Sequence, residues 1–382
     1  MDTPTCTVPS AVVVGTTGQR VSVTVELLRR LPAFTLVGVP SAHMRETGER
    51  VRSAIASSGL EFPRKRVVAQ VSPDVQLGVP GLDLAAAIAT LCADGVKGTA
   101  ALTAGRHLLA AELGLNGDLR PVRGILAIAQ VAGDQGQVLV CAPSDANKVA
   151  AYLPYVTVAS APTLAALLEG HLAPGDASQH PTVNGYGPRP VMDDVVGQDT
   201  PKAMLAAAAA MRARVLLVGP PGAGKTMLAR RAASLLGEMT QDEQTANAIV
   251  FDVAGLYATS DRPFRAPHHG VSPQALCGDS AGRCLGETAL ARHGVLFLDE
   301  APAFSRNALE SLEQCLRKPG EAPPWVIMSA TGCPCGCRFS GRDSACVCTP
   351  EARAAWSHRL TTLRADVVIY VTPTPLKAMR NR

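Results

Sequence analysis

Residues Gly219 to Thr226 read GPPGAGKT. An apolar, β-branched run from Val215 to Val218 comes directly before them, and a helix-forming run from Met227 to Ala233 follows. The octet fits the pattern G-x-x-x-x-G-K-[ST], whose glycines allow backbone N–H groups to turn inward around a polyphosphate. A strand, a tight loop and a helix in this order therefore predict a P-loop in a parallel α/β domain.

The side chains of this loop suit a nucleotide and its metal. Lys225 is expected to reach the β- and γ-phosphates, and the Thr226 hydroxyl is expected to bind Mg²⁺. The alternative is a glycine-rich turn in an ordinary α/β domain. The predicted ATP- and Mg²⁺-binding residues are Gly219, Pro220, Pro221, Gly222, Ala223, Gly224, Lys225, Thr226 and, from the motif described next, Asp299.

A second motif, GVLFLDE at Gly294 to Glu300, is an apolar run that ends in two carboxylates. Such a run is typical of a buried parallel strand whose C-terminal end meets the nucleotide. Asp299 is the expected second Mg²⁺ ligand, and Glu300 is the expected catalytic residue that polarises the attacking water. A core strand followed by a solvated acidic turn is the alternative. The two motifs together favour nucleotide binding.

The composition fits a two-domain α/β protein. The chain has 382 residues, of which 47% are hydrophobic and only 4% aromatic, and this length exceeds one ordinary domain. A net charge of +4 does not by itself argue for nucleic acid. No run approaches the roughly 20 apolar residues that span a bilayer, and the first residues lack a secretion signal, so we expect a cytoplasmic protein with no membrane partner and reduced cysteines.

Residues His171 to Pro190 lose apolar periodicity and are rich in proline and glycine, which marks a linker. The predicted division is a first domain over 1–172, a linker over 173–190 and a P-loop domain over 191–382. In the first domain, apolar strands alternate with two helices, and Ser41 is expected to cap the first of them. The predicted strands are 11–14, 21–25 and 66–71, and the predicted helices are 41–58 and 82–92.

With these motifs in place, the chain resembles the ComM/YifB family of AAA+ ATPases, which are relatives of the ChlI ATPase subunit of magnesium chelatase. In the first domain the resemblance rests on LPAFTLVGVP (31–40), ERVRSAIASSGLEFPRKRV (49–67) and GDLRPVRGIL (117–126). In the second it rests on VVGQDTPKAML, the P-loop, RPFRAPHHGVS (262–272), GVLFLDEAPAF, and GCPCG followed by CVCTP.

The resemblance implies an α+β first domain similar to the Lon protease domain (ribosomal S5 domain 2-like), without its peptidase dyad. The AAA+ domain that follows would be a three-layer α/β/α fold. The resemblance further implies homo-oligomeric, hexameric rings whose partner is single-stranded or branched DNA. The implied role is ATP-driven branch migration during recombination in natural transformation. A magnesium chelatase-like motor subunit is an alternative.

Three departures from the family pattern bear on catalysis. Thr331 stands where the family usually carries an asparagine that helps to position the attacking water. Arg364, or alternatively Arg359, matches the arginine that acts on a neighbouring subunit's γ-phosphate. The sequence stops at Arg382, about where the resemblance places a helical lid. These departures lead us to expect impaired hydrolysis, or a non-hydrolysing regulatory paralogue that joins mixed rings with an intact relative.

A cysteine cluster follows Thr331. Two C-x-C pairs could hold a structural Zn²⁺ in a loop with too few apolar residues to fold alone. The preferred ligands are Cys333, Cys335, Cys346 and Cys348, with Cys337 as the spare thiol. Reduced or redox-active thiols are the alternative, because zinc pairs more often have the spacing C-x₂-C.

The segment RAPHHG also carries a hypothesis about DNA. His268 and His269 could contact DNA phosphate or metal, although a structural role is the commoner one for histidines in a proline-flanked loop. Arg262 and Arg265 stand close to them in the sequence. The resemblance places this loop on the functional face of the ring, and a DNA contact there, tested by replacing both arginines, is our hypothesis.

Overall fold

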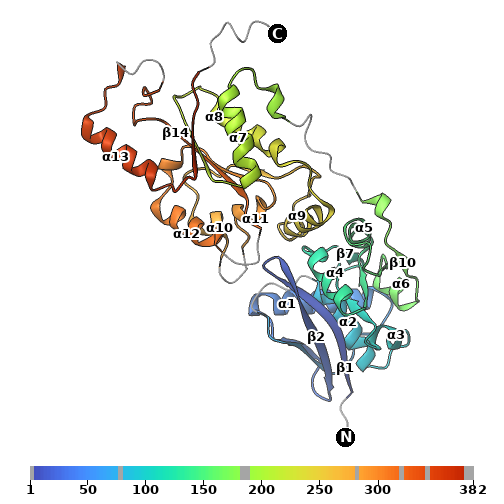
Figure 1. Ribbon diagram of the computed structural model, residues 1–382. Coiled ribbons are helices and arrows are strands. Elements are labelled where there is room, and N and C mark those ends of the chain that lie inside the picture. The colour runs from blue at the N-terminus through green and yellow to red at the C-terminus, as the bar shows by residue number, and fades with distance from the viewer. Residues whose placement is uncertain are drawn as a thin grey trace. The chain divides into compact units, whose positions relative to one another are not determined.

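The computed structural model describes residues 4–75, 81–180, 190–279, 284–317, 322–339 and 345–373. The chain forms two compact units (Figure 1). Unit 1 comprises residues 1–182 together with 248–258, and unit 2 comprises residues 183–247 and 259–382.

Unit 1 contains a four-stranded sheet in the order β1-β2-β4-β3. Strands β1 and β2 form a long antiparallel hairpin in which Val14 pairs with Thr17. Strand β4 is antiparallel to β2 and parallel to β3. The strands are β1 (Thr5–Val14), β2 (Thr17–Leu28), β3 (Ala33–Val37) and β4 (Arg66–Ser72).

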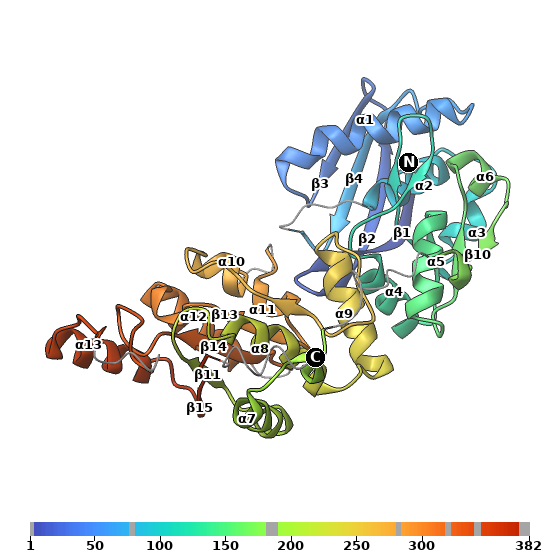
Figure 2. The same cartoon turned by 90° about the horizontal axis from the view of Figure 1, so that it is seen from above.

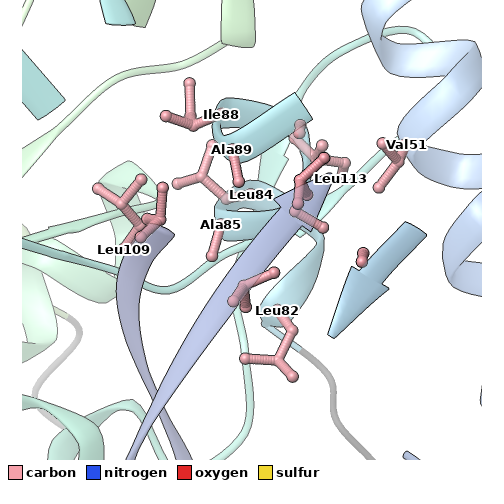
Figure 3. Packing of buried hydrophobic residues seen from close by; sticks show 14 of the residues in the cluster. Val51, Leu82, Leu84, Ala85, Ile88, Ala89, Leu109 and Leu113 are labelled. Carbon is pink, nitrogen blue, oxygen red and sulfur yellow. The ribbon is translucent and has the colours of Figure 1, made fainter. Parts of the chain in front are cut away.

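Two helices build the core against this sheet, α1 (Ser41–Ser57) and α2 (Leu82–Ala93). The sequence of α2, LDLAAAIATLCA, is apolar on every side, so the helix is buried on nearly every residue. Figure 3 shows Leu84 and Ile88 of α2 among the packed side chains, with Val51 of α1 nearby. The prediction that Ser41 caps α1 is wrong, because Pro40 occupies the cap position and provides no side-chain cap.

The second sheet of unit 1 has the order β10-β9-β8-β5, with β5, β8 and β9 parallel and β10 antiparallel. Helices α4 and α5 pack on it with apolar faces that include Ile125 and Val149. The elements are α3 (Thr99–Thr103), β5 (His107–Leu109), β6 (Glu112–Leu113), β7 (Leu119–Arg120), α4 (Ile125–Asp134), β8 (Val138–Cys141), α5 (Pro143–Tyr152), β9 (Val158–Ser160), α6 (Leu164–Leu168), β10 (Ala173–Pro174) and the 3₁₀ turn η1 (Ala177–Gln179).

The predicted linker begins too early, because its first residues belong to unit 1. Ala173 pairs with Ser160, and the backbone N–H of Asp176 donates to Asn147 on α5. Residues 181–189 of the predicted linker lie outside the described residues. The boundary is also crossed once more, since residues 248–258 belong to unit 1, where Ile249 joins the core. A linear division could not anticipate this segment.

Unit 2 is built on a five-stranded sheet in the order β12-β13-β14-β11-β15, in which all neighbouring strands are parallel. The P-loop follows β11 and the two carboxylates follow β13, so both motifs lie at the carboxyl end of the sheet. The strands are β11 (Val215–Val218), β12 (Phe264–Arg265), β13 (Val295–Leu298), β14 (Trp325–Ala330) and β15 (Val367–Tyr370).

Helices cover both faces of this sheet. One face packs Leu217, Phe297 and Ile327 against α7 and α8. The other face packs Leu298 and Met328 against α10 and α12, and Figures 1 and 2 show the two helical layers. The remaining elements are η2 (Met192–Asp194), α7 (Asp199–Met211), α8 (Lys225–Ala232), η3 (Ala233–Leu236), α9 (Gln241–Val253), α10 (Pro273–Cys277), α11 (Glu287–Leu290), η4 (Ala301–Ala303), α12 (Arg306–Leu316) and α13 (Pro350–Thr361).

The predicted fold class is confirmed: an α+β unit precedes a three-layer α/β/α P-loop unit. Within the described residues, every helix is too short or too polar to cross a membrane.

Candidate nucleotide site

The loop between β11 and α8 has backbone conformations that require glycine. Gly224 stands at the N-cap of α8 with φ of 96°, a left-handed conformation that a side chain would strain. A Cβ on Gly219 would lie 2.2 Å from the carbonyl oxygen of Val371, directly after β15. A larger residue at position 219 would therefore clash with this backbone. The glycines therefore allow the N-terminus of α8 to face an anion.

Lys225 is the first residue of α8, and its ammonium is turned back over the loop. Its Nζ donates hydrogen bonds of 2.9 Å to the carbonyl oxygens of Gly219 and Pro220. Partial burial lowers the pKa of Lys225, while the negative charges of Asp299 and Glu300 act in the opposite direction. A polyphosphate at this position would favour the charged form of the lysine.

Thr226 on α8, Asp299 after β13 and Ser329 on β14 form a chain of hydrogen bonds. The Thr226 hydroxyl donates to Oδ2 of Asp299 at 3.0 Å, and the Ser329 hydroxyl donates to Oδ1 of the same carboxylate at 2.5 Å. Ser329 belongs to β14, which lies between β11 and β13. The structure thus brings together the two residues predicted to bind Mg²⁺, and Ser329 fixes their carboxylate.

Sequence reasoning missed Ser329. The available signal was a hydroxyl near the end of an otherwise apolar strand, WVIMSA. The Ser329 side chain is fully buried, and a buried hydroxyl needs a partner. The sheet order identifies Asp299 as this partner, because it places β14 next to β13.

Glu300 follows Asp299 in a left-handed conformation with φ of 52°, which costs energy for a residue with a side chain. Its backbone N–H donates to the Ser329 hydroxyl at 3.0 Å, and its side chain is exposed. The strained turn therefore directs the side chains of Asp299 and Glu300 into different surroundings. Asp299 is held by hydroxyl groups, while Glu300 is free to face solvent at the end of β13.

Thr331 lies directly after β14, at the same end of the sheet. Its hydroxyl donates to the carbonyl oxygen of Cys333 at 2.8 Å, and its own carbonyl accepts from Nε1 of Trp356 at 2.9 Å. Strand β14 reaches the P-loop here, because the N–H of Gly219 donates to the carbonyl of Ala330. Thr331 is thus close to the P-loop, but its hydroxyl is engaged within its own turn.

Arg364 lies at the opposite end of the sheet from the P-loop, whereas Arg359 lies on α13. Arg364 precedes β15, which runs parallel to β11 with Val367 opposite Val215. Both arginines line a cavity of about 710 Å³ with Arg306 and Glu310. Four residues of parallel strand span roughly 13 Å, which separates the backbone of Arg364 from the P-loop of its own chain.

Four of the clustered cysteines converge on one point. The Sγ atoms of Cys333, Cys335, Cys346 and Cys348 all lie within 4.8 Å of one another, and Cys337 is not part of this set. The N–H of Cys337 lowers the pKa of Cys335 to about 6, with a smaller contribution from Cys348. An acidic thiol in a cysteine cluster favours metal binding or reaction with oxidants.

Arg262 and Arg265, the arginines named in the DNA-contact hypothesis, are both engaged in contacts within unit 2. The Arg262 side chain donates to three backbone carbonyls and to Glu243, and it is almost entirely buried. Arg265 makes a two-point ion pair with Glu287. Both guanidinium groups therefore hold the fold together. Of the two histidines, His268 is exposed, and its ring lies 3.9 Å from that of His269.

The donor set suits Mg²⁺ and a polyphosphate. Thr226 and Asp299 supply oxygen ligands, which Mg²⁺ prefers, and they already share a hydrogen bond. Lys225 and the N-terminus of α8 supply positive charge for the phosphates. The residues present therefore fit both groups.

Comparisons with known proteins agree with this site. The family described as "Magnesium chelatase, subunit ChlI" matches residues 191–379, and "Subunit ChlI of Mg-chelatase" matches residues 23–145. Among solved structures, the RuvB Holliday junction branch migration motor of Thermotoga maritima is 21% identical over half of each chain. The TM-score of this match is 0.30.

Curated relatives extend the match across both units. Competence protein ComM of Haemophilus influenzae is 36% identical over 307 residues, which cover 78% of this chain and 60% of that protein. YifB of Escherichia coli is 34% identical over 315 residues, with the same two shares. The chain therefore spans about 60% of the length of these two relatives. A protein of Mycobacterium bovis is 32% identical over 380 residues, which cover 92% of this chain and 73% of the relative. With the P-loop, the paired Thr226 and Asp299, and relatives that match both units, the chain belongs to the ComM/YifB family of AAA+ ATPases.

Proposed function

We propose that this protein binds and hydrolyses ATP to drive the movement of DNA strands. The observation that carries the proposal is the hydrogen bond between Thr226 and Asp299, because it joins the start of α8 to the end of β13 in one oxygen-rich site beside Lys225. An ordinary glycine-rich turn would not need a carboxylate from a separate strand at this point.

Each group of residues in the site has a separate role in phosphoryl transfer. The N–H groups of the P-loop and Lys225 hold the β- and γ-phosphates, and Thr226 and Asp299 hold the metal. When bound, Mg²⁺ would offset the negative charge that the phosphates share. Glu300 orients the attacking water and accepts its proton, since its exposed carboxylate stands next to Asp299.

Assembly would complete the site. Arg364 lies away from the P-loop of its own chain and therefore acts on the nucleotide of a neighbouring copy. Arginines that act in trans contribute about 10³- to 10⁵-fold to the rate in well-studied NTPases. We propose a homo-oligomeric ring on this basis, and six subunits because the family resemblance implies a hexamer.

The proposed substrate is single-stranded or branched DNA in the cytoplasm, and the proposed process is branch migration during recombination in natural transformation. Support comes from the relative named competence protein ComM. The test uses the variants Lys225→Ala and Glu300→Gln to separate nucleotide binding from hydrolysis. ATP hydrolysis should rise when branched DNA is added to the wild-type chain. Lys225→Ala should lose nucleotide binding, whereas Glu300→Gln should keep binding and lose turnover by about 10²-fold or more.

Two results would count against this function. Hydrolysis that is unaffected by any DNA would favour a chelatase-like motor subunit, and full turnover in Glu300→Gln would remove Glu300 from the mechanism. Basal hydrolysis measured beside nucleotide affinity separates a failure of chemistry from a failure of binding.

A second candidate function is a nucleotide-binding partner that does not turn over and joins mixed rings with an intact relative. The engaged hydroxyl of Thr331 favours it, because this group donates to Cys333 in its own turn rather than to a water at the phosphate. Binding of ATP without hydrolysis, together with co-purification with an active relative, would support this candidate.

A further inference from the structure

We propose that Cys333, Cys335, Cys346 and Cys348 bind one Zn²⁺ ion through four thiolates, and that this ion fixes α13 to the end of β14 beside the P-loop. The metal site does not depend on the proposed ATPase function. It rests on four side chains, on the turn that carries two of them, and on the poor packing of α13.

The sulfur geometry fits one tetrahedral ion. The Sγ atoms of Cys333 and Cys335 are 3.4 Å apart, those of Cys335 and Cys346 are 3.6 Å apart, and those of Cys346 and Cys333 are 3.8 Å apart. Four Zn–S bonds of about 2.3 Å in a tetrahedron separate the sulfurs by roughly 3.8 Å. A disulfide needs about 2.05 Å, and all four cysteines are free. The thiols thus converge as a set of four, not as two bonded pairs.

The backbone around the first pair supports bound thiolates. The N–H of Gly336 donates to the carbonyl of Cys333 and closes a turn around Cys335. The N–H of Arg338 donates to the Sγ of Cys333 at 3.3 Å. Such N–H groups hold a ligating sulfur in place and stabilise its negative charge. Cys333 is fully buried at this point.

Helix α13 has few anchors among its own side chains. None of its residues is buried, and a helix of this length is marginal in water without tertiary packing. Cys348 precedes its N-cap, Thr349. Its other ties are the Trp356 hydrogen bond to Thr331 and the partly buried Leu360. In both ribbon views α13 lies at the periphery of unit 2 (Figures 1 and 2).

The same turn touches the nucleotide loop. A Cβ on Gly336 would lie 3.0 Å from the ring of Pro221, so the turn closed by the first cysteine pair packs directly on the P-loop. An ion that joins this turn to the start of α13 would therefore hold three parts of the unit together: the end of β14, the P-loop and α13. Helix α13 carries Arg359 and is followed by Arg364.

The first experiment is the metal content of the full chain, purified under reducing conditions without chelator. We expect about one zinc per chain in the wild type and in Cys337→Ser, whose thiol lies in the same loop but outside the set. Cys335→Ser and Cys346→Ser should lose the metal. The proposal fails if the reduced wild type lacks zinc and takes up neither Zn²⁺ nor Co²⁺, or if it is isolated with disulfides among these cysteines. Equal metal loss in Cys337→Ser would also refute the ligand set.

The second experiment removes zinc from the folded wild type, so that it does not depend on variants that fail to fold. Hydrogen exchange of residues 331–336 and 350–361 should accelerate by about tenfold or more, while the amides of β11 change little. If zinc leaves and α13 keeps its protection, the ion does not anchor the helix and this part of the proposal is wrong.

Discussion

The Thr226 hydroxyl donates a 3.0 Å hydrogen bond to Oδ2 of Asp299, a residue 73 positions further along the chain. The two residues follow β11 and β13, which are not neighbours in the sheet, because β14 lies between them. Ser329 of β14 bridges this gap by donating to the other oxygen of the Asp299 carboxylate. The site is therefore held by three adjacent strands, and its precision depends on their register.

Replacing Ser329 with alanine should impair turnover more than nucleotide binding. The change removes the donor to Asp299 Oδ1 and the acceptor of the Glu300 N–H at once. A hydrogen bond to a charged group contributes about 1.5–3 kcal/mol, so we expect the turnover number to fall roughly 10- to 100-fold while ATP affinity changes less than severalfold. Steady-state kinetics beside direct nucleotide binding measures the difference.

Ser357→Ala is the matched control for this prediction, because Ser357 is an exposed serine on α13. It should leave both quantities unchanged. Equal losses of affinity and turnover in Ser329→Ala, with a lower unfolding temperature, would show instead that Ser329 only supports the fold.

Arg364 should act on the neighbouring copy. Arg364→Ala alone and Lys225→Ala alone should both be inactive, but a mixture should regain part of the hydrolysis, because some interfaces then pair an intact Lys225 with an intact Arg364. Rates measured across mixing ratios report this complementation. Arg306→Ala, in the same cavity wall, is the control. Normal activity in Arg364→Ala would show that Arg364 does not act on the neighbouring nucleotide. The trans-acting arginine would then be Arg359, or the mechanism would use none.

Arg50 should stabilise unit 1 strongly, although it stands in a basic part of the sequence. Its guanidinium makes two hydrogen bonds, of 2.6 and 3.2 Å, to the fully buried carboxylate of Asp83. Arg50→Ala would leave that carboxylate without a counter-charge, with only the N–H of Leu113 donating to it, and should cost about 3–5 kcal/mol. Arg64→Ala, which breaks an exposed pair with Glu61, should cost about 0–1 kcal/mol.

Urea unfolding followed by circular dichroism measures both arginine variants. Both tryptophans, Trp325 and Trp356, lie in unit 2, so fluorescence identifies the transition of that unit and separates it from unit 1. If Arg50→Ala and Arg64→Ala lose similar amounts of unfolding free energy, the burial of the Asp83 carboxylate does not make the Arg50 ion pair more important than the exposed one.

Asp145 should make unit 1 less stable as the pH rises. Burial raises its pKa to about 7, and the negative charge of Asp252 adds to this effect. The Lys148 ammonium acts in the opposite direction, but it lies closer to Asp252, at 2.7 Å, than to Asp145, at 3.8 Å. An unfolded aspartate has a pKa of about 3.9, so the native state holds a proton between these values that the unfolded state releases. The free energy of unfolding then falls by up to about 1.4 kcal/mol per pH unit.

Asp145→Asn should flatten this dependence between about pH 4 and 7, since an amide oxygen can still accept from the N–H of Val122. Urea unfolding of unit 1 at several pH values tests it. Asp134→Asn changes an exposed aspartate at the end of α4 and should keep the wild-type profile. An unchanged slope in Asp145→Asn would assign the pH dependence to another group.

The sequence by itself determined the local chemistry of the site. GPPGAGKT after an apolar strand predicts the P-loop, because its glycines allow the tight turn, its lysine suits the phosphates and its threonine suits Mg²⁺. Each of these properties can be read from a few consecutive residues. The apolar run before Asp299 predicts its strand in the same way. Helix α2 was also predictable, because its apolar residues continue around the whole helix.

Only the tertiary structure decided which distant residues meet. The Ser329 hydroxyl gains its role from the sheet order, which places β14 between β11 and β13. Arg262 resembles an exposed DNA-binding residue in the sequence, yet it is buried on carbonyl groups supplied by two other segments. The assignment of residues 248–258 to unit 1 likewise follows from long-range burial. Local patterns record what a residue can do, whereas strand order and packing between distant segments determine which partner it finds.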